Sequence, residues 1–333
     1  MCIIRNDSVI LHATFHILRR CTTFEKKLMK YFIIILFITL VSCKKESKTE
    51  CDYITNYYQN LYQADIAFET ENYKKAFEMY QEAFNSCEPI NTEGYNELAN
   101  FAETCAILGK KVLAIEFIKK QIERGYEIKW FQQNENFDII FASEEGKKLI
   151  SEYDYLRNMA LSKMNLALRE EIKQMKTEDQ KYRNDNFQKN IKKQVEIDAY
   201  NTNRIIEIFN EFGYPNETVI GSYSIDQTSV HISTMLLHTS DSIRMKYFVP
   251  KLTEFIKSGT CSPSTLGYII DQYYLYNDEP QIYGTYHAQG GGYGRMIDDL
   301  KKVDSNRISI GLPPLELKEK KDSILKVRYP DLF

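Results

Sequence analysis

The chain has 333 residues, with 43 Lys and Arg against 46 Asp and Glu, and a formal net charge of −3. Proteins that hold nucleic acid through its phosphates need basic faces, so this acidic balance excludes a sequence-independent nucleic-acid binder. Beyond Cys43 the remaining cysteines form no CxxC pair, and no Cys/His spacing fits a zinc site. The composition therefore predicts no nucleic-acid partner, no metal and no cofactor.

An apolar run covers residues 31–41, with three lysines between residues 26 and 30 before it and Ser42 and Cys43 after it. This order of a basic, an apolar and a small-residue part is typical of an export signal. The run of about 11 residues is too short to cross a bilayer, which needs ~20. We therefore expect a signal peptide over residues 29–42.

The residues Leu40, Val41, Ser42 and Cys43 resemble the lipobox of bacterial lipoproteins. The resemblance implies that the Cys43 thiol receives a diacylglycerol, that the chain is cut before Cys43, and that the new amino group is acylated. Several acyl chains hold a protein at a membrane firmly, at ~0.8 kcal/mol per buried methylene. An uncleaved hydrophobic tail is the alternative.

Residues 43–52 are expected to form a charged, lipidated tether. A lysine and an acidic residue directly after the cysteine resemble the surface-export signals of Bacteroidota lipoproteins. We therefore expect an outer-membrane lipoprotein, and either a periplasmic or a surface-exposed location fits. From Cys43 onward the net charge falls to about −7, because the preceding segment holds six Lys/Arg and two Asp/Glu.

Lipoprotein signals are short, so Met29 is the expected start of the protein. Residues 1–28 would then be a gene-model extension. Its thiols and imidazoles should carry no chemistry; these are Cys2, Cys21, His12 and His16.

Two helix pairs are expected over residues 57–85 and 94–124, at one offset of ~38 residues, which lies in the range of helical solenoid periods. The offset aligns Ala64 with Ala102, Ala76 with Ala114, and Tyr80 with Ile118. The first pair resembles a tetratricopeptide repeat. That resemblance implies a short helical solenoid over residues 53–153, whose concave face binds a protein or peptide partner.

Aromatic residues follow the second pair, and a helix is expected over residues 144–153. Trp130, the single tryptophan, is predicted to plug the end of the solenoid core rather than to serve as a ligand platform. Cys105 lies on an apolar helical face, so a buried thiol is favoured over a disulfide with Cys87.

Helical spacing continues through a connector over residues 154–169 into a C-terminal helical domain over residues 170–333. Within it, helices are expected over residues 194–212, 226–237, 241–257 and 262–276, followed by a Gly/Tyr-rich loop. The predicted fold class is mainly α, with a solenoid followed by a second, mostly helical domain.

Short motifs occur in order through residues 170–330. They resemble a bacterial family catalogued as domain of unknown function 6624, which implies no particular activity. Tyr286 and Gln272 depart from the family pattern, where glutamine and arginine are expected. The matching pieces are Asp179-Gln180 with Arg183, Phe212-Gly213-Tyr214-Pro215, Leu237-His238, Asp271-Gln272, Pro280-Gln281-Ile282-Tyr283-Gly284-Thr285, Val303-Asp304 with Arg307, and Gly311-Leu312-Pro313-Pro314-Leu315.

His231 and His238 are seven residues apart on one presumed helix, so they would share one face. That spacing is too long for tight joint chelation, although with Asp271 they could act as acid and base. A hydrogen-bonded core histidine is the alternative for His238. The candidate catalytic residues are His238, Asp271, Tyr283 and His287.

The densest polar segment covers residues 278–295, where glycine-rich backbone can present N–H groups to an anion. An ordinary surface loop is the alternative. Ion bridges that fix helix packing are a further alternative for Asp179 with Arg183 and for Asp304 with Arg307. The candidate ligand-binding residues are Gln281, Tyr283, Thr285, Arg295 and Arg307.

Together these features favour a membrane-anchored envelope lipoprotein that serves as a protein- or peptide-binding scaffold without established catalysis. The alternative is a hydrolase-like enzyme or a small-ligand-binding domain that uses the His/Asp/Tyr/Arg cluster of the C-terminal domain. Convergence of those side chains in one cleft would favour the alternative.

Overall fold

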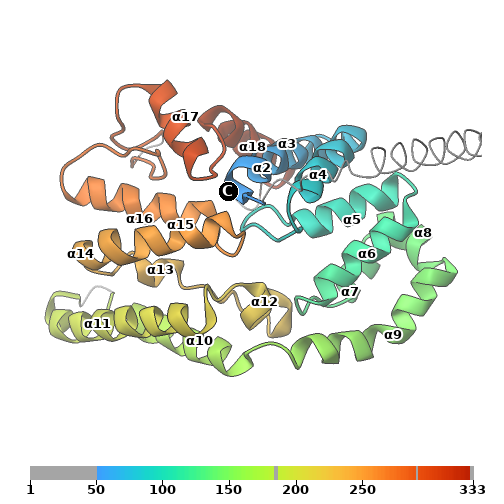
Figure 1. Cartoon of the computed structure of the whole chain (residues 1–333), viewed down its shortest axis with the longest axis horizontal. Helices are drawn as coiled ribbons and strands as arrows, with labels where there is room; N and C mark the ends of the chain where they lie inside the picture. Colours follow the sequence, from blue (N-terminus) through green and yellow to red (C-terminus); the bar gives the residue numbers. More distant parts are fainter. Residues whose placement is uncertain (1–50, 184–186, 290–291, 331–333) are drawn as a thin grey trace, which may run out of the picture. The chain divides into compact units, whose positions relative to one another are not determined.

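Helices make up most of the computed structural model, which describes residues 51–183, 187–289 and 292–330 (Figure 1). No strand occurs in these ranges; the extended segments form two isolated β-bridges, Gln281 with Met296 and His287 with Tyr293. The predicted mainly α fold class is confirmed. The signal peptide, Cys43 and residues 1–28 lie outside the described residues. None of the described helices is both long and apolar enough to cross a membrane.

The first half of the chain is a series of paired helices. They are α2 (Tyr53–Asn56), α3 (Tyr58–Glu69), α4 (Tyr73–Ser86), α5 (Glu97–Ile107), α6 (Lys111–Ile122), α7 (Lys129–Gln132), the 3-10 turn η1 (Glu135–Phe137), α8 (Asp138–Phe141) and α9 (Glu144–Leu161).

The second half continues with longer helices joined by short turns. They are α10 (Leu166–Lys181), α11 (Phe187–Phe212), α12 (Glu217–Ile220), η2 (Tyr223–Ile225), α13 (Ser233–Leu236), α14 (Asp241–Ile243), the π turn η3 (Arg244–Phe248), α15 (Val249–Lys257), α16 (Pro263–Tyr276), α17 (Leu300–Ser309) and α18 (Leu315–Arg328).

The helix pairs α3–α4 and α5–α6 pack as the aligned positions predict. Small residues let paired helices approach closely, and every aligned side chain is completely buried: Ala64, Ala76, Tyr80, Ala102, Ala114 and Ile118. Helix α5 then packs against both α3 and α4, as successive pairs of a solenoid do. Helix α9 is continuous across residue 153, where the solenoid was expected to end.

The predicted role of Trp130 is wrong. Its side chain is 45% exposed, whereas the adjacent Phe131 is 5% exposed and meets Phe137 edge to face. Helix α7 has only four residues, so neighbouring side chains point in different directions and only one of the two aromatic rings faces the core. Phe131 therefore closes this end of the core.

The helix expected over residues 226–237 is also wrong except for its last turn, α13. The Arg169 guanidinium donates to Asp226 Oδ1 (2.6 Å) and to the carbonyl of Thr228 (2.7 Å), which holds this backbone in a non-helical path. Residues 228–232 are also rich in β-branched side chains, which favour helices weakly. The helices expected over residues 194–212, 241–257 and 262–276 are confirmed.

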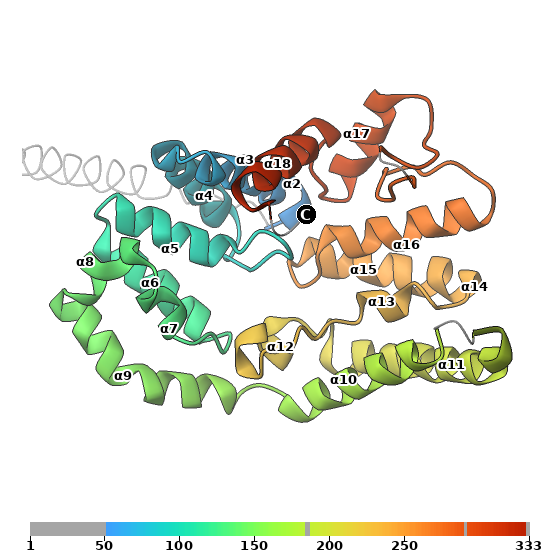
Figure 2. The same cartoon turned by 180° about the vertical axis from the view of Figure 1, so that it is seen from behind.

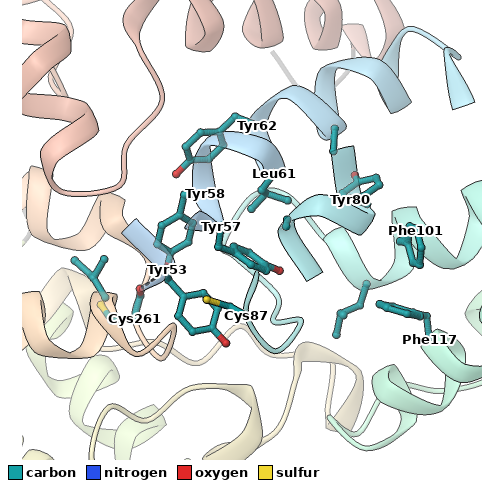
Figure 3. Packing of buried hydrophobic residues seen from close by; sticks show 14 of the residues in the cluster. Tyr53, Tyr57, Tyr58, Leu61, Tyr62, Tyr80, Cys87, Phe101, Phe117 and Cys261 are labelled. Atoms are coloured by element: carbon teal, nitrogen blue, oxygen red, sulfur yellow. Dashed lines mark hydrogen bonds between the residues drawn. The ribbon is translucent and has the colours of Figure 1, made fainter. Parts of the chain in front are cut away.

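A tyrosine-rich face on α2 and α3 joins the N-terminal and C-terminal halves (Figure 3). The Tyr62 hydroxyl donates to the carbonyl of Gly311 (2.5 Å), and Gln59 Nε2 donates to that of Leu312 (3.1 Å). Gly311 has φ +90°, and a Cβ there would meet the Tyr58 ring at 2.8 Å, so the close approach requires glycine. Contacts of this kind group Cys51–Phe333 into one unit.

Helix α18 lies along α3 (Figure 2) and is held mainly by charge. Lys321 Nζ is 2.8 Å from Asp65 Oδ2 and sits 3.5 Å from the centroid of the Tyr95 ring, and Arg328 pairs with Glu69 at 3.5 Å. Leu315 is the buried side chain of this helix. Burial raises the pKa of Asp65 to about 6, although the Lys321 ammonium opposes the shift.

Glu97 is a completely buried carboxylate at the start of α5. It accepts hydrogen bonds from the Thr92 amide (2.7 Å to Oε2), the Thr92 hydroxyl (2.7 Å to Oε1) and the Tyr57 hydroxyl (3.3 Å). These bonds fix the loop of residues 90–96 and the start of α5 against Tyr57, which lies between α2 and α3. Burial raises the pKa of Glu97 to about 7 despite the hydrogen bonds.

This raised pKa predicts a pH dependence of stability. The folded chain keeps the Glu97 proton up to about pH 7, whereas the unfolded chain loses it near 4.5, so the free energy of unfolding falls between these values. Glu97→Gln removes this pH-dependent part of the free energy of unfolding. In urea unfolding, the free energy of unfolding of the variant minus that of the wild type should rise by on the order of 1–3 kcal/mol between pH 4.5 and 8.

Glu82→Gln on the exposed side of α4 is the matched control, and it should follow the wild type at every pH. A Glu97→Gln profile parallel to the wild type would contradict the prediction.

Candidate functional site

Asp271 on α16 anchors the polar loop that follows this helix. Its buried carboxylate accepts the amide N–H groups of Ile282 (2.9 Å), Tyr283 (3.0 Å) and Thr285 (2.9 Å), and also the Thr285 hydroxyl (2.8 Å). Burial raises the pKa of Asp271 even though these donors favour its charged form. Its oxygens are therefore used to shape the loop.

The side chains of Gln281 and Arg307 also form hydrogen bonds with backbone groups. The Gln281 side chain accepts from the Tyr286 amide (2.7 Å) and donates to the Tyr286 carbonyl (3.0 Å). The Arg307 guanidinium donates to the carbonyls of Pro313 (2.5 Å) and Tyr283 (2.7 Å). Both side chains are buried, so their hydrogen-bonding groups point into the fold.

Tyr283 and Thr285 are buried, whereas His287 and Arg295 are exposed. His287 Nδ1 lies 3.0 Å from the carbonyl of Gly292, and its ring stacks on Tyr293. The Arg295 guanidinium pairs with Asp278 Oδ1 at 2.8 Å at a solvent-facing position. In the described ranges, no hydrogen bond or ion pair joins His238 to Asp271, Tyr283 or His287. The sequence-predicted cluster therefore divides into a buried loop anchor and separate surface groups.

The two helical-domain histidines do not share a helix face as predicted, because α13 is too short to carry both. His231 precedes α13, with Nδ1 2.7 Å from the Ser233 hydroxyl and Nε2 3.2 Å from Lys176 Nζ. Burial lowers the pKa of His231, and the Lys176 charge lowers it further. His238 follows α13 and faces α10 and α11.

His238 meets a buried carboxylate from a distant part of the chain. Its Nδ1 is 3.0 Å from Oδ1 of Asp179, whose side chain is 1% exposed. Arg183 Nε lies 3.5 Å from Asp179 Oδ2, and the Arg183 guanidinium also pairs with Asp198 on α11. Burial alone would raise the pKa of Asp179, but the hydrogen bond from His238 and the charges of His238 and Arg183 outweigh it and lower the pKa.

The expected ion bridges are therefore found for one pair and not for the other. Asp179 is close to Arg183, whereas Asp304 Oδ1 accepts the Leu315 amide (2.8 Å) and Arg307 binds carbonyl oxygens. Sequence reasoning placed His238 with Asp271 and missed Asp179, 59 residues earlier. The order of the Asp179 and His238 motifs was visible in the sequence, but their contact was not.

A cavity of about 320 Å³ lies between the loop of residues 90–96 and residues 214–231. This volume falls at the lower end of small-ligand pockets, roughly 300–1,000 Å³. Among its lining side chains, Glu217 accepts from Asn91 Nδ2 (2.9 Å) and from the Tyr126 hydroxyl (3.1 Å). Tyr214, Glu93 and His231 also line it.

Two carboxylates, Glu93 and Glu217, and the guanidinium of Arg124 line the cavity, and burial raises the pKa of Glu217. Glu93 is exposed at the cavity edge. The one arginine in the wall, Arg124, donates to the carbonyls of Lys120 (2.7 Å) and Pro89 (3.1 Å), so its guanidinium is engaged within the fold. The lowered pKa of His231 leaves its imidazole neutral at pH 7. The exposed Glu93 carboxylate would attract a ligand that carries an amino group.

The four cysteines in the described residues divide into one disulfide and two buried thiols. Cys51 and Cys87 are joined, with their Cα atoms 5.3 Å apart, a pairing that the sequence left open. Cys105 is a free buried thiol, as expected, and so is Cys261. Burial raises the pKa of each free thiol to about 12, so neither is a reactive thiolate at neutral pH.

Comparison with known proteins gives no relative: no family model, no curated protein and no solved structure matches the chain.

The anchoring role of Asp271 makes a quantitative prediction. Asp271→Asn should lower the free energy of unfolding by about 2–4 kcal/mol, because an amide leaves one nitrogen facing the loop N–H donors. Urea unfolding measures the change. Asp278→Asn, at a carboxylate in the same loop that faces solvent, should change little. Equal effects of the two substitutions would contradict the assignment.

Proposed function

We propose that this protein is a lipid-anchored envelope protein that binds a short peptide segment in the cavity between residues 90–96 and residues 214–231. The observation that carries the proposal is the cavity itself, whose polar wall is contributed by both halves of the chain. It combines tyrosine rings with amide, hydroxyl and carboxylate groups. Such a wall offers both contact area and hydrogen bonds to a peptide.

The membrane tether rests on the sequence Leu40-Val41-Ser42-Cys43 and its flanks. The disulfide between Cys51 and Cys87 adds independent support, because disulfides persist in oxidising compartments such as the periplasm and the cell surface. It lies only eight residues after Cys43, so the tether would end at a covalently fixed point of the folded part.

Binding is favoured over hydrolysis because the residues proposed for catalysis do not converge. Asp271, Gln281 and Arg307 hold backbone groups of the loop, and His287 lies at the surface. A general base and a nucleophile need to meet within hydrogen-bond reach of one substrate atom. His231 in the cavity lining meets the Ser233 hydroxyl at 2.7 Å, but Ser233 is not among the lining residues. The thiol of Cys261 in the lining is protonated at neutral pH.

The cavity is also a more open site than the α3 side of the repeats. Along α3, the groups Gln59, Tyr62, Asp65 and Glu69 already contact the segment of residues 311–328. A partner at that face would have to displace α18. The cavity needs no such rearrangement.

The proposed membrane tether predicts that Cys43 is lipidated. A fatty-acid probe should label the wild-type protein in growing cells, and Cys43→Ala should lose the label because the acceptor thiol is absent. Gel fluorescence after immunoprecipitation measures it. Cys105→Ala, at a buried thiol, is the matched control and should keep the label. Label that survives in Cys43→Ala would refute the tether, and protease shaving of intact cells would separate a surface location from a periplasmic one.

The proposed peptide site predicts that a short peptide with a positive charge binds the protein. The tripeptide Lys-Ala-Ala should bind the protein in calorimetry, whereas its N-acetylated, side-chain-acetylated form should bind more weakly because it lacks positive charge. Glu93→Gln at the cavity edge should weaken binding of Lys-Ala-Ala about 3- to 10-fold, as expected for loss of one partly screened charge contact.

The control for this experiment is Glu82→Gln, which removes an exposed carboxylate on α4 outside the cavity lining and should leave the affinity unchanged. Equal affinities for Glu93→Gln and wild type would exclude the cavity as the peptide site.

A further inference from the structure

We propose that Asp179, Asp198 and His238 form a binding site for a divalent transition-metal cation such as Zn²⁺. This inference is independent of the peptide cavity. Each of the three residues offers one ligand atom, and these atoms lie within 4.8 Å of one another. They come from α10, from α11 and from the turn after α13, so only the folded chain brings them together.

The distances allow the site to close on an ion. Zinc binds carboxylate oxygen and imidazole nitrogen at ~2.0–2.2 Å, so tetrahedral ligand atoms stand roughly 3.4 Å apart. Movements of about 1 Å therefore suffice. The Asp198 and His238 side chains are 21% and 20% exposed, which gives them room to adjust, whereas Asp179 is fixed at 1%.

A buried amide beside the cluster has an unused acceptor. Gln194, which is 1% exposed, places its amide against the Asp198 carboxylate and the Asp179 backbone, with Nε2 donating to Asp198 Oδ1 (3.0 Å) and to the Asp179 carbonyl (3.2 Å). Its Oε1 is buried and finds no hydrogen-bond partner in the described part of the chain. An orphan buried acceptor beside two carboxylates is stabilised by a cation or by the water that a cation holds.

Arg183 acts as the cation of the cluster in this structure. Its guanidinium pairs with Asp198 and reaches Asp179, while its buried Nε makes no hydrogen bond with any residue that the structure describes. Two carboxylates against one guanidinium leave an excess negative charge when His238 is neutral. A divalent ion would therefore compete with Arg183, whose side chain is 20% exposed and can swing out to solvent.

The ligand set indicates the type of ion. One imidazole with two carboxylates suits zinc or manganese, whereas magnesium prefers an all-oxygen octahedron and keeps its waters. The remaining contacts resemble outer-shell support: Gln180 Nε2 donates to Asp179 Oδ2 (2.6 Å). Three protein ligands would leave a coordination position for water.

The test is zinc binding to the full-length chain in detergent, measured by competition with a chromophoric chelator. The wild type should bind one Zn²⁺ per chain. Asp198→Asn and His238→Gln should each weaken the affinity about tenfold or more, because each removes a ligand. Arg183→Gln should tighten it, because it removes the competing guanidinium. Glu170→Gln, at an exposed carboxylate on the same helix, should have no effect.

The Arg183→Gln result separates a metal site from an ion bridge that only fixes helix packing. An ion bridge predicts lower thermal stability in this variant and no gain in zinc affinity. Zinc binding that is unchanged in both Asp198→Asn and His238→Gln would place the ion elsewhere and overturn the proposal, as would a wild type that binds none. Circular dichroism reports whether each variant folds. If His238→Gln does not fold, Asp198→Asn still tests the proposal, because the Asp198 side chain is partly exposed.

Discussion

The phenol hydroxyls on α3 have to be buried and hydrogen-bonded at once, and much of the fold depends on meeting that condition. Tyr58 and Tyr62 are buried, and their hydroxyls donate to the carbonyls of Cys261 and Gly311, 203 and 249 residues away. A buried hydroxyl without a partner costs about 1–3 kcal/mol. The repeat-like helices are therefore completed by the C-terminal segment, and the surface of α3 becomes an internal contact rather than an open groove.

The same requirement accounts for three buried polar side chains of the C-terminal half, Asp271, Gln281 and Arg307. Asp271 and Gln281 bind amide and carbonyl groups of a loop that has no strand or helix to satisfy them, and Arg307 binds the carbonyls of Pro313 and Tyr283. Such residues look functional in a sequence because they are polar and clustered. Polar groups outside this role gather in two other places, the cavity beside Glu93 and the cluster around His238.

The site was only partly predictable. His238 was recognised as a candidate, but the sequence offered Asp271 and His231 as its neighbours, whereas the folded chain gives it Asp179 and Asp198. The reason is a single turn. Arg169 holds Asp226 and the Thr228 carbonyl, so the expected helix never forms before Ser233 and the direction of the following histidine changes. A local pattern cannot anticipate a hydrogen bond from an arginine that lies 57 residues earlier.

The sequence by itself determined the helical class, the spacing of small residues that pair α3 with α4 and α5 with α6, and the predicted signal before Cys43. These features depend on periodicity within a few turns, which hydrophobic burial enforces on any helix. Only the tertiary structure decided that Cys51 joins Cys87, that Phe131 rather than Trp130 closes the core, and that Asp179 meets His238. Each of those outcomes depends on which distant segments pack together, because burial selects partners by shape and by unmet hydrogen bonds rather than by distance along the chain.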